Sequence, residues 1–266
     1  MKIARFATNT GPRHAEYDAA QWHILDGEIG SHLRRTGDIM PADSKMLAPC
    51  EPRVVVGMAH NWLPDGRDFA AQAFLKSART VIGPGEEIVL DPTLGLLNVE
   101  AELAIVIGCT ARHLTRENAL RAVFGFTIGN DVTAPDQSPI DELLLQSKNG
   151  DGYTPLGPWI ETELDGFDSL EMRVLLDGEL AASGNTADLA NLVIDQLVHV
   201  TRYLTLGAGD VILGGCPGSL AAVESGHSVR LEIEGLGALE NRVHTAATAT
   251  EAEAEAEKET TNAAHR

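Results

Sequence analysis

The chain has 266 residues and carries 39 Asp and Glu residues against 20 Lys and Arg residues, which gives a formal net charge of -19. So acidic a protein repels phosphate backbones and anionic membrane surfaces, which argues against nucleic acids and lipids as partners. No stretch approaches the roughly 20 apolar residues of a membrane-spanning helix, and the start of the chain lacks the apolar segment of a secretory signal. With three widely spaced cysteines, Cys50, Cys109 and Cys216, these features predict a cytoplasmic protein.

The first part of the chain consists of short apolar pieces separated by turn residues such as Asp26-Gly27. This pattern predicts a small β-rich lobe over residues 1–48. From residue 49 to residue 244 the chain continues as many short strands with Gly and Pro between them, which predicts one larger domain. Two hairpins are expected there, over residues 79–90 and 172–183, the second closed by Asp177-Gly178 in a type I′ turn.

Two stretches have helical character. Residues 115–126 begin with Thr115 and carry an acid, Glu117, in the first turn ahead of the apolar positions. Residues 185–204 place Leu189, Val193 and Leu197 on one side, as in an amphipathic helix.

The last segment, residues 245–266, is dominated by Ala, Thr and Glu and has almost no large apolar side chain that could enter a core. Its acids Glu251, Glu255 and Glu259 repel one another at a spacing of four residues. We therefore expect a disordered, solvated acidic tail. An acidic tail that binds a partner is the alternative interpretation.

The stretch "NVEAELAIVIG", residues 98–108, alternates like a strand and places Glu100 and Glu102 on a face that continues with Ala104 and Val106. Two adjacent buried carboxylates need a cation between them or a proton on one of them. A third acid, Asp131, ends the apolar run "VFGFTIGND". Oxygen ligands of this kind suit Mg²⁺, Mn²⁺ or Ca²⁺. The alternative is that Glu100 and Glu102 lie on a solvated outer face.

Six segments occur in a fixed order: "FLKSARTVIGPGEEI", "VEAELAIVIG", "GFTIGNDVT", "SKNGDGYTPLGPWI", "LGAGDVILGGCPG" and "ALENRV". In this order they resemble the fumarylacetoacetate hydrolase family, over roughly residues 50–243. The resemblance implies a β-rich α+β fold, built on a rolled, layered mixed β-sheet with a few short helices, and a homodimer. It also implies that Glu100, Glu102 and Asp131 bind a divalent cation, Mg²⁺ first, and that the substrate is a small dioxo acid or its enol.

The same resemblance matches Lys148 to the family's site lysine and Asp151 to the acid that follows it, which would orient Lys148 or its loop. Physically, an ammonium group beside a 2-oxo acid can hold the carboxylate and stabilise an enolate, and a metal does the same as a Lewis acid. The alternative is that Lys148 is an ordinary surface lysine in a loop.

The sequence departs from the family's pattern near residue 60. Hydrolases of the family carry a histidine and a glutamate after an Asn-Tyr pair, whereas this chain has Asn61-Trp62 and His60 alone. His60 is the candidate general base, with a structural histidine as the alternative, and Asp65 or Asp68 is a candidate for the missing glutamate.

Two further departures concern the substrate. Pro135 stands where the family commonly has an arginine, which removes a carboxylate clamp. Cys216 replaces a threonine that usually contacts the substrate, so a thiol takes the place of a hydroxyl.

These features predict a metal-dependent hydrolase that cleaves a C–C bond in an acylpyruvate-like dioxo acid. Lys148 and His60 would be catalytic, Asp151 and Cys216 would contact the substrate, and the cation would be held by the three acids named above. The alternatives are a decarboxylase or isomerase, acting on an oxaloacetate-like or carboxymethyl-hydroxymuconate-like acid, and a non-catalytic member of the family that binds metal.

Overall fold

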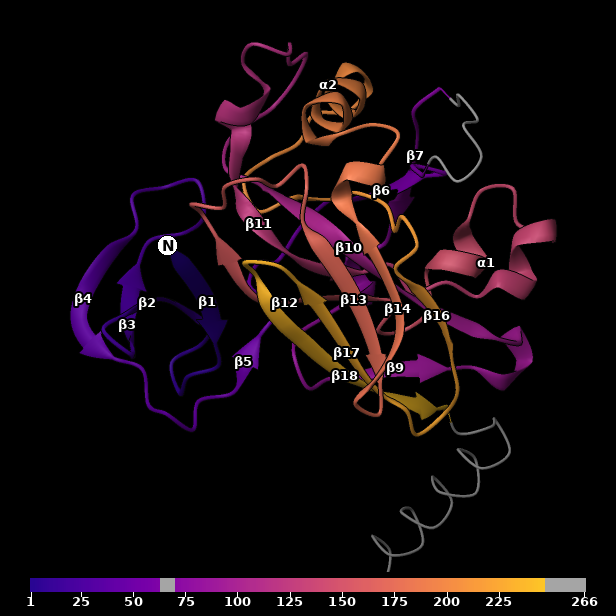
Figure 1. The fold of residues 1–266 in the computed structure, drawn as a ribbon. Coiled ribbons are helices and arrows are strands. Elements are labelled where there is room, and N and C mark those ends of the chain that lie inside the picture. Colours follow the sequence, from indigo (N-terminus) through magenta and orange to yellow (C-terminus); the bar gives the residue numbers. More distant parts are fainter. Residues whose placement is uncertain (63–69, 247–266) are drawn as a thin grey trace, which may run out of the picture.

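The computed structural model describes residues 1–62 and 70–246, and the strands of this part of the chain form two β-sheets (Figure 1). Among the described residues, no helix has the length and apolar character needed to span a membrane. The prediction of a β-rich α+β fold is confirmed.

The larger sheet has the strand order β4-β3-β2-β1-β12-β11-β10-β15-β6-β7, and β5, β8 and β16 pair with β1, β12 and β10. Its strands in the described chain are β1 (Lys2–Phe6), β2 (Arg13–Asp18), β3 (Gln21–Asp26), β4 (Arg34–Ile39), β5 (Met46–Leu47), β6 (Val55–Ala59), β7 (Gln72–Lys76), β8 (Val81–Ile82), β10 (Leu97–Ile107), β11 (Val123–Asn130), β12 (Thr154–Glu161), β15 (Val211–Leu213) and β16 (Leu220–Val223).

The smaller sheet has the order β14-β13-β17-β18-β9, and it packs on the larger one through contacts of β13 and β17 with β10. Its strands are β9 (Glu87–Leu90), β13 (Glu171–Leu176), β14 (Glu179–Asn185), β17 (Ser228–Ile233) and β18 (Gly237–Thr245). The helices in the described chain are α1 (Leu145–Lys148), α2 (Val193–Tyr203) and the short 3₁₀ helices η1 (Ala78–Thr80), η2 (Pro92–Leu94), η3 (Ala119–Ala122), η4 (Pro135–Ile140) and η5 (Thr186–Asp188).

The side chains of β10 alternate between two separate cores, as its sequence predicts. Leu103 and Ile105 belong to the main core, which also contains side chains of the smaller sheet and of α2. Ala104 and Val106 face the opposite way, into a second core formed with β12 and β15. Because both faces of β10 are covered at Glu100 and Glu102, these two side chains are buried and need specific partners.

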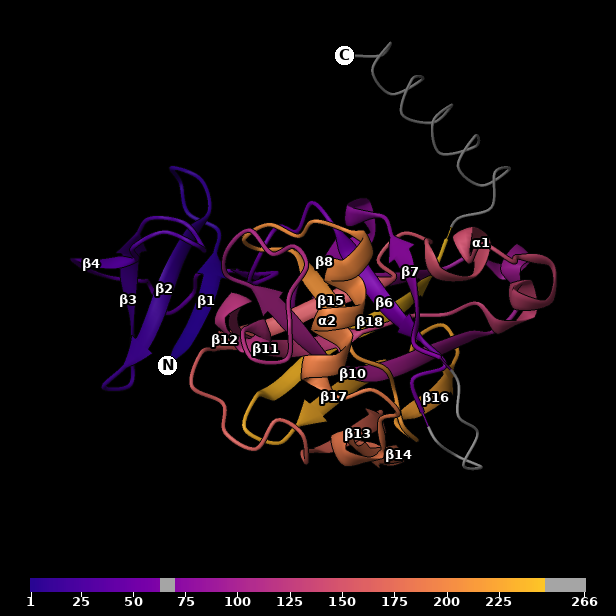
Figure 2. The same cartoon turned by 90° about the horizontal axis from the view of Figure 1, so that it is seen from above.

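The N-terminal strands β1 to β4 lie together at one side of the molecule (Figure 2). They continue the larger sheet because β1 pairs antiparallel with β12, with Ile3 opposite Ile160. The lobe is therefore joined to the rest of the sheet by main-chain hydrogen bonds. That residues 1–48 form a unit of their own stays a prediction.

The hairpin expected over residues 172–183 is present. β13 and β14 are antiparallel, and the two residues between them, Asp177 and Gly178, have φ of 51° and 88°. Positive φ at both positions is what a type I′ turn requires, and its twist matches that of the flanking strands.

The prediction of a hairpin over residues 79–90 is wrong. β8 pairs parallel with β12, and β9 pairs parallel with β18. The Gly-Pro-Gly segment between them carries the chain from one sheet to the other, so local turn chemistry did not reveal the partners of the two strands.

Both helix predictions are too long. Within residues 115–126 only η3 is helical, and Val123 begins β11, whose β-branched and aromatic residues pair between β10 and β12. In the second stretch η5 covers three residues and α2 begins at Val193, so Leu189 lies outside the helix.

At the C-terminus, Thr245 is the last residue of β18, and the Ala246 N–H donates to Leu90 O at 2.9 Å. Thr245 and Ala246 therefore belong to the folded chain and not to the predicted tail. Its remainder, residues 247–266, lies outside the described residues.

Candidate active site

The candidate site lies where β10 changes its neighbour in the larger sheet. Residues 97–100 pair with β16, and residues 104–106 pair with β15. The loop joining these two neighbours, residues 214–219, runs beside the middle of β10 and is held there by main-chain hydrogen bonds. Glu100 and Glu102 project from this stretch, and both side chains are buried.

Glu102 receives a hydrogen bond from the loop, because the Gly215 N–H donates to Glu102 Oε2 at 2.8 Å. The backbone of Gly215 has φ of +105°, which glycine adopts without strain. Burial raises the pKa of Glu102 well above its usual value, and the negative charges of Asp131 and Glu100 raise it further. The site therefore disfavours a charge on Glu102 unless a cation is added.

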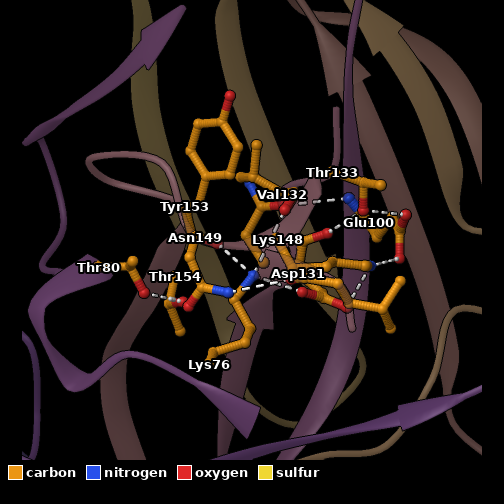
Figure 3. Close-up of polar contacts among 12 residues, drawn as sticks. Lys76, Thr80, Glu100, Asp131, Val132, Thr133, Lys148, Asn149, Tyr153 and Thr154 are labelled. Carbon is orange, nitrogen blue, oxygen red and sulfur yellow. Dashed lines mark hydrogen bonds and ion pairs between the residues drawn. The ribbon is translucent and has the colours of Figure 1, made fainter. Parts of the chain in front are cut away.

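Asp131 directly follows β11 and is bound by two lysines (Figure 3). Lys76 Nζ donates to Asp131 Oδ1, and Lys148 Nζ donates to Oδ2 at 2.5 Å. Burial alone would raise the pKa of Asp131, but the two ammonium groups outweigh it and hold the pKa below the usual value. Asp131 is therefore ionised.

The two lysines differ in their surroundings. The Lys76 side chain is fully buried and also donates to Tyr153 O at 2.8 Å (Figure 3). Burial and the nearby Lys148 lower the pKa of Lys76, although Asp131 opposes this shift. Burial also acts to lower the pKa of Lys148, but Asp131 and Glu100 outweigh it and raise that pKa. Lys148 is thus a fixed positive charge and a hydrogen-bond donor.

Glu100 connects the lysines to the loop. Its Oε1 accepts a hydrogen bond from Thr133 Oγ1 at 2.6 Å, and its Oε2 lies 3.3 Å from Lys148 Nζ. Cys216 Sγ donates to the same Oε2 at 3.4 Å. Burial and the two glutamates raise the pKa of the Cys216 thiol well above its usual value, so Cys216 is a donor and not a thiolate nucleophile.

Three side chains at this point offer ligand atoms to a cation. One atom each from Glu100, Glu102 and Cys216 lie within 4.8 Å of one another. The donor set fits a divalent ion, since a buried carboxylate with a raised pKa, here Glu102, gains most from a nearby positive charge. Asp131, predicted as the third ligand, lies outside this group and is bound to the lysines, and Lys148 links it to Glu100.

The position of Lys148 depends on a short loop. Lys148 ends helix α1, and the buried carboxylate of Asp141 accepts hydrogen bonds from Leu145 N–H at 3.0 Å, Ser147 N–H at 2.8 Å and Ser147 Oγ at 2.8 Å. Asp141 thereby satisfies the free donors at the start of the helix.

A cavity of about 440 Å³ opens above these groups. Its walls combine the charged cluster with residues of β6, β7 and the loop before α1: Met58, Ala59, His60, Asn61, Trp62, Phe74, Glu100, Glu102, Asp131, Ser138, Asp141, Glu142, Leu144, Lys148, Gly215 and Cys216. The structure thus brings together six of the predicted site residues: His60, Glu100, Glu102, Asp131, Lys148 and Cys216.

The other predicted residues lie elsewhere. Asp151 is exposed, lies outside the lining of the cavity, and uses its backbone carbonyl to accept from Val89 N–H at 3.2 Å. Pro135 opens η4 and is also outside the lining. Asp65 and Asp68 fall in residues 63–69, outside the described residues.

Sequence reasoning assigned no role to Lys76 or Asp141. Lys76 ends the alternating segment "QAFLK" with a charge on the buried side of β7, which was the available signal. No local pattern pointed to Asp141, because its contacts depend on the path of the loop before α1.

The chain is similar in sequence and in fold to known proteins. A family model described as fumarylacetoacetate (FAA) hydrolase C-terminal matches residues 52–244. Protein Rv2993c of Mycobacterium tuberculosis is 32% identical over 259 residues, which cover 91% of this chain and 98% of that protein.

Among the relatives whose names state a reaction are a hydrolase and an isomerase. Maleylpyruvate hydrolase of Aquipseudomonas alcaligenes is 38% identical over 247 residues, covering 84% of both proteins. The crystal structure of 5-carboxymethyl-2-hydroxymuconate delta-isomerase from Mycobacterium smegmatis superposes with a TM-score of 0.87 at 31% identity, over 92% of this chain and 100% of that one. Chains with this architecture therefore include both a hydrolase and an isomerase.

Proposed function

The chain belongs to the fumarylacetoacetate hydrolase family, and from this membership we propose that it is a divalent-metal-dependent hydrolase that cleaves a C–C bond in an acylpyruvate. The observation that carries the proposal is the buried group of three carboxylates and two lysines at the base of the cavity. Such a group is costly to bury and is suited to stabilising the negative charge of an enolate.

The metal would be held by Glu100 and Glu102, with Cys216 beside them and Asp131 adjacent across Lys148. When bound, a divalent ion such as Mg²⁺ or Mn²⁺ supplies Lewis-acid polarisation of the two neighbouring oxygen atoms of the substrate. Glu102, whose pKa is raised in its absence, would then be ionised.

Lys148 donates hydrogen bonds to the carboxylate or enolate oxygen of the substrate, and its raised pKa keeps it protonated throughout. Lys76 keeps Asp131 ionised and fixes its orientation through Oδ1. The Cys216 thiol, which contacts the same Glu100 oxygen as Lys148, supplies a further, weaker donor.

His60 lines the cavity and is the proposed general base. It would take a proton from water as the water oxygen attacks the acyl carbonyl. The C–C bond then breaks, its electron pair passes to the pyruvate part as an enolate, and protonation of the enolate carbon yields pyruvate and a carboxylic acid. Asp151 keeps its proposed role of orienting the loop that follows Lys148.

Decarboxylation or tautomerisation of a related 2-oxo acid is the second candidate. It is favoured by one observation: among the described residues of the cavity lining, His60 is the sole imidazole. Both reactions pass through an enolate and need the metal and Lys148, but neither needs an activated water molecule.

The test is to supply the Mg²⁺- or Mn²⁺-loaded protein with acylpyruvates and oxaloacetate, and to identify the products. Pyruvate with a second carboxylic acid indicates hydrolysis, CO₂ indicates decarboxylation, and an unchanged mass with loss of the enol absorbance indicates tautomerisation. We expect Lys148→Met to lower kcat by about 100-fold to 1,000-fold, while the matched control Lys45→Met, an exposed lysine paired with Glu86, keeps full activity. Unchanged activity of Lys148→Met would overturn the proposal.

A further inference from the structure

A second cavity of about 740 Å³ adjoins the candidate active site. It lies around β6 and β7, between α2 and the loop before α1 (Figure 1). Its walls are mainly apolar and include Val56, Phe74, Leu75, Val200, Tyr203 and Leu204. Nothing in the chemistry proposed above uses this space.

The two cavities share part of their walls and therefore lie side by side. Ala59, His60, Phe74, Glu142 and Leu144 line each of them. The ring of Phe74 stands at the boundary, because Lys148 Nζ lies 5.2 Å from its centre on the active-site side. An extended substrate held by Lys148 would therefore pass over Phe74 to enter the second cavity.

The charges along this path differ at its two ends. The active-site end has Lys148 and the metal ligands, which suit a carboxylate and two oxo groups. Among the described residues that line the second cavity, none is Lys or Arg, and Glu142 at the boundary adds a negative charge. The cavity also has the imidazole of His199, whose pKa burial and Arg202 lower, which disfavours its cationic form. A second carboxylate placed there would lose its hydration without gaining a cationic partner, whereas an alkyl or aryl group would gain from leaving water.

We infer that the second cavity binds the acyl part of the substrate, and that this part is an apolar chain or ring without a terminal carboxylate. The inference rests on the proposed function and adds the class of substrate. Acylpyruvates with medium alkyl chains or an aryl group are the expected substrates, and dicarboxylic analogues are poor ones.

The first experiment measures kcat/KM of the metal-loaded protein for acetyl-, butanoyl-, hexanoyl- and benzoylpyruvate and for succinylpyruvate. We expect kcat/KM to rise about fourfold for each added methylene group, which is the transfer free energy of a CH₂ group expressed as a ratio. Butanoyl- and succinylpyruvate have acyl groups of equal length, and we expect the succinyl compound, with its terminal carboxylate, to be at least tenfold poorer. If kcat/KM does not depend on chain length, or is higher for the succinyl compound, the inference is overturned. Turnover of acetylpyruvate in that case would leave the proposed function standing.

The second experiment changes the cavity. Ala73 of β7 lines the second cavity but not the first. Ala73→Phe should lower the ratio of kcat/KM for hexanoyl- over acetylpyruvate at least tenfold, and Ala181→Phe, at an exposed position of β14, should leave it unchanged. Tyr203→Ala is a second variant, and it should fold normally because Tyr203 is 66% exposed. It should lower the same ratio of kcat/KM about threefold. Equal ratios in all these variants, or a change of oligomeric mass in place of a change of ratio, would overturn the inference.

A binding measurement separates the inference from the reaction. Straight-chain 2-oxo acids of increasing length are added to the metal-loaded protein, and the thermal midpoint is recorded. If no acylpyruvate is turned over but the midpoint still rises with chain length, the proposed hydrolysis is wrong and the apolar subsite stands. If turnover occurs and the midpoint is independent of chain length, the subsite is wrong.

Discussion

The two sides of the candidate site compensate their buried charges differently. On the lysine side, Asp131 is 2% exposed and binds Lys76 and Lys148. On the loop side, Glu102 is also 2% exposed, and its described hydrogen bond comes from the Gly215 backbone. The pKa of Asp131 is lowered, whereas that of Glu102 is raised.

Burial alone therefore does not decide whether a carboxylate in this site is charged. Burial acts to raise the pKa of both acids, and the two ammonium groups reverse the result for Asp131. On the lysine side, the charge of Asp131 is already compensated by Lys76 and Lys148. On the loop side, Glu102 would be stabilised in its charged form by an added cation. That is why the cation is expected near Glu102 and not between the lysines.

The largest effect is expected for Asp131→Asn. The substitution leaves two buried ammonium groups without their shared carboxylate, so the free energy of unfolding should fall by about 3–5 kcal/mol in denaturant titrations. Asp195→Asn is the matched control, because Asp195 pairs with Arg116 at the surface and should change stability by less than about 1 kcal/mol. Equal effects of the two substitutions would remove the distinction drawn between the two sides.

The opposite result is expected for Glu102→Gln. The metal-free variant should be as stable as the natural chain or more stable, because the carboxylate it removes has no cation of its own. Added metal should no longer raise the thermal midpoint, whereas at 100 times the dissociation constant it stabilises the natural chain by about 2.7 kcal/mol. Full metal-dependent stabilisation of the variant would place the cation elsewhere.

The pH dependence of metal-free stability follows from the raised pKa of Glu102. With its pKa above the ordinary value of 4.5, the folded protein keeps a proton that the unfolded chain has released, so stability falls as pH rises. The free energy of unfolding of the natural chain should decline relative to Glu102→Gln by up to about 1.4 kcal/mol per pH unit. Chelator-treated samples of both proteins, unfolded in urea at several pH values above 5, measure the difference, and parallel curves would contradict it.

A smaller effect is expected for Cys216→Ser. Sulfur prefers softer metals than carboxylate oxygen does, and Cys216 Sγ lies 3.4 Å from Glu100 Oε2. The substitution should weaken Co²⁺ binding by about tenfold and leave Mg²⁺ binding nearly unchanged, as measured by calorimetry. A loss of the near-ultraviolet absorption of the Co²⁺ protein would accompany it. If both metals bind equally well to the variant, Cys216 is only a neighbour of the ligands.

The smallest effect is expected for removal of residues 247–266. The deletion keeps Ala246 and its hydrogen bond to Leu90, so β18 and β9 remain paired. Stability and activity should be unchanged. A loss of turnover in the shortened chain would show that the acidic tail has a role in the reaction.

Much of this arrangement was accessible from the sequence where the pattern was regular over many residues. The alternation of β10 and the Asp177-Gly178 turn predicted both local structure and burial, because each depends only on residues close in the chain. The pairing of β8 and β9 with two different sheets was not accessible, since parallel partners lie far away in the sequence. Residues 123–126 were mistaken for part of a helix because the pairing of their strand with β10 and β12 outweighs the local signal.

The same division between local patterns and distant contacts holds for the residues of the candidate site. Glu100, Glu102, Asp131 and Lys148 were found because conspicuous acids and a family motif marked them. Lys76 was missed because a single lysine in a short strand is common at surfaces, and only the folded chain turns it toward Asp131. The separation of the acids into a paired one and an unpaired one also depends on distances that no linear pattern contains.

The exchange of strand partners along β10 has a consequence for how such proteins diverge. Glu100 and Glu102 project from a central strand whose backbone is paired on both edges, whereas the walls that would meet the rest of a substrate come from three other segments: β7, α2 and the residues before α1. Substitutions in these three segments can therefore alter which molecule is recognised while the two glutamates stay in place.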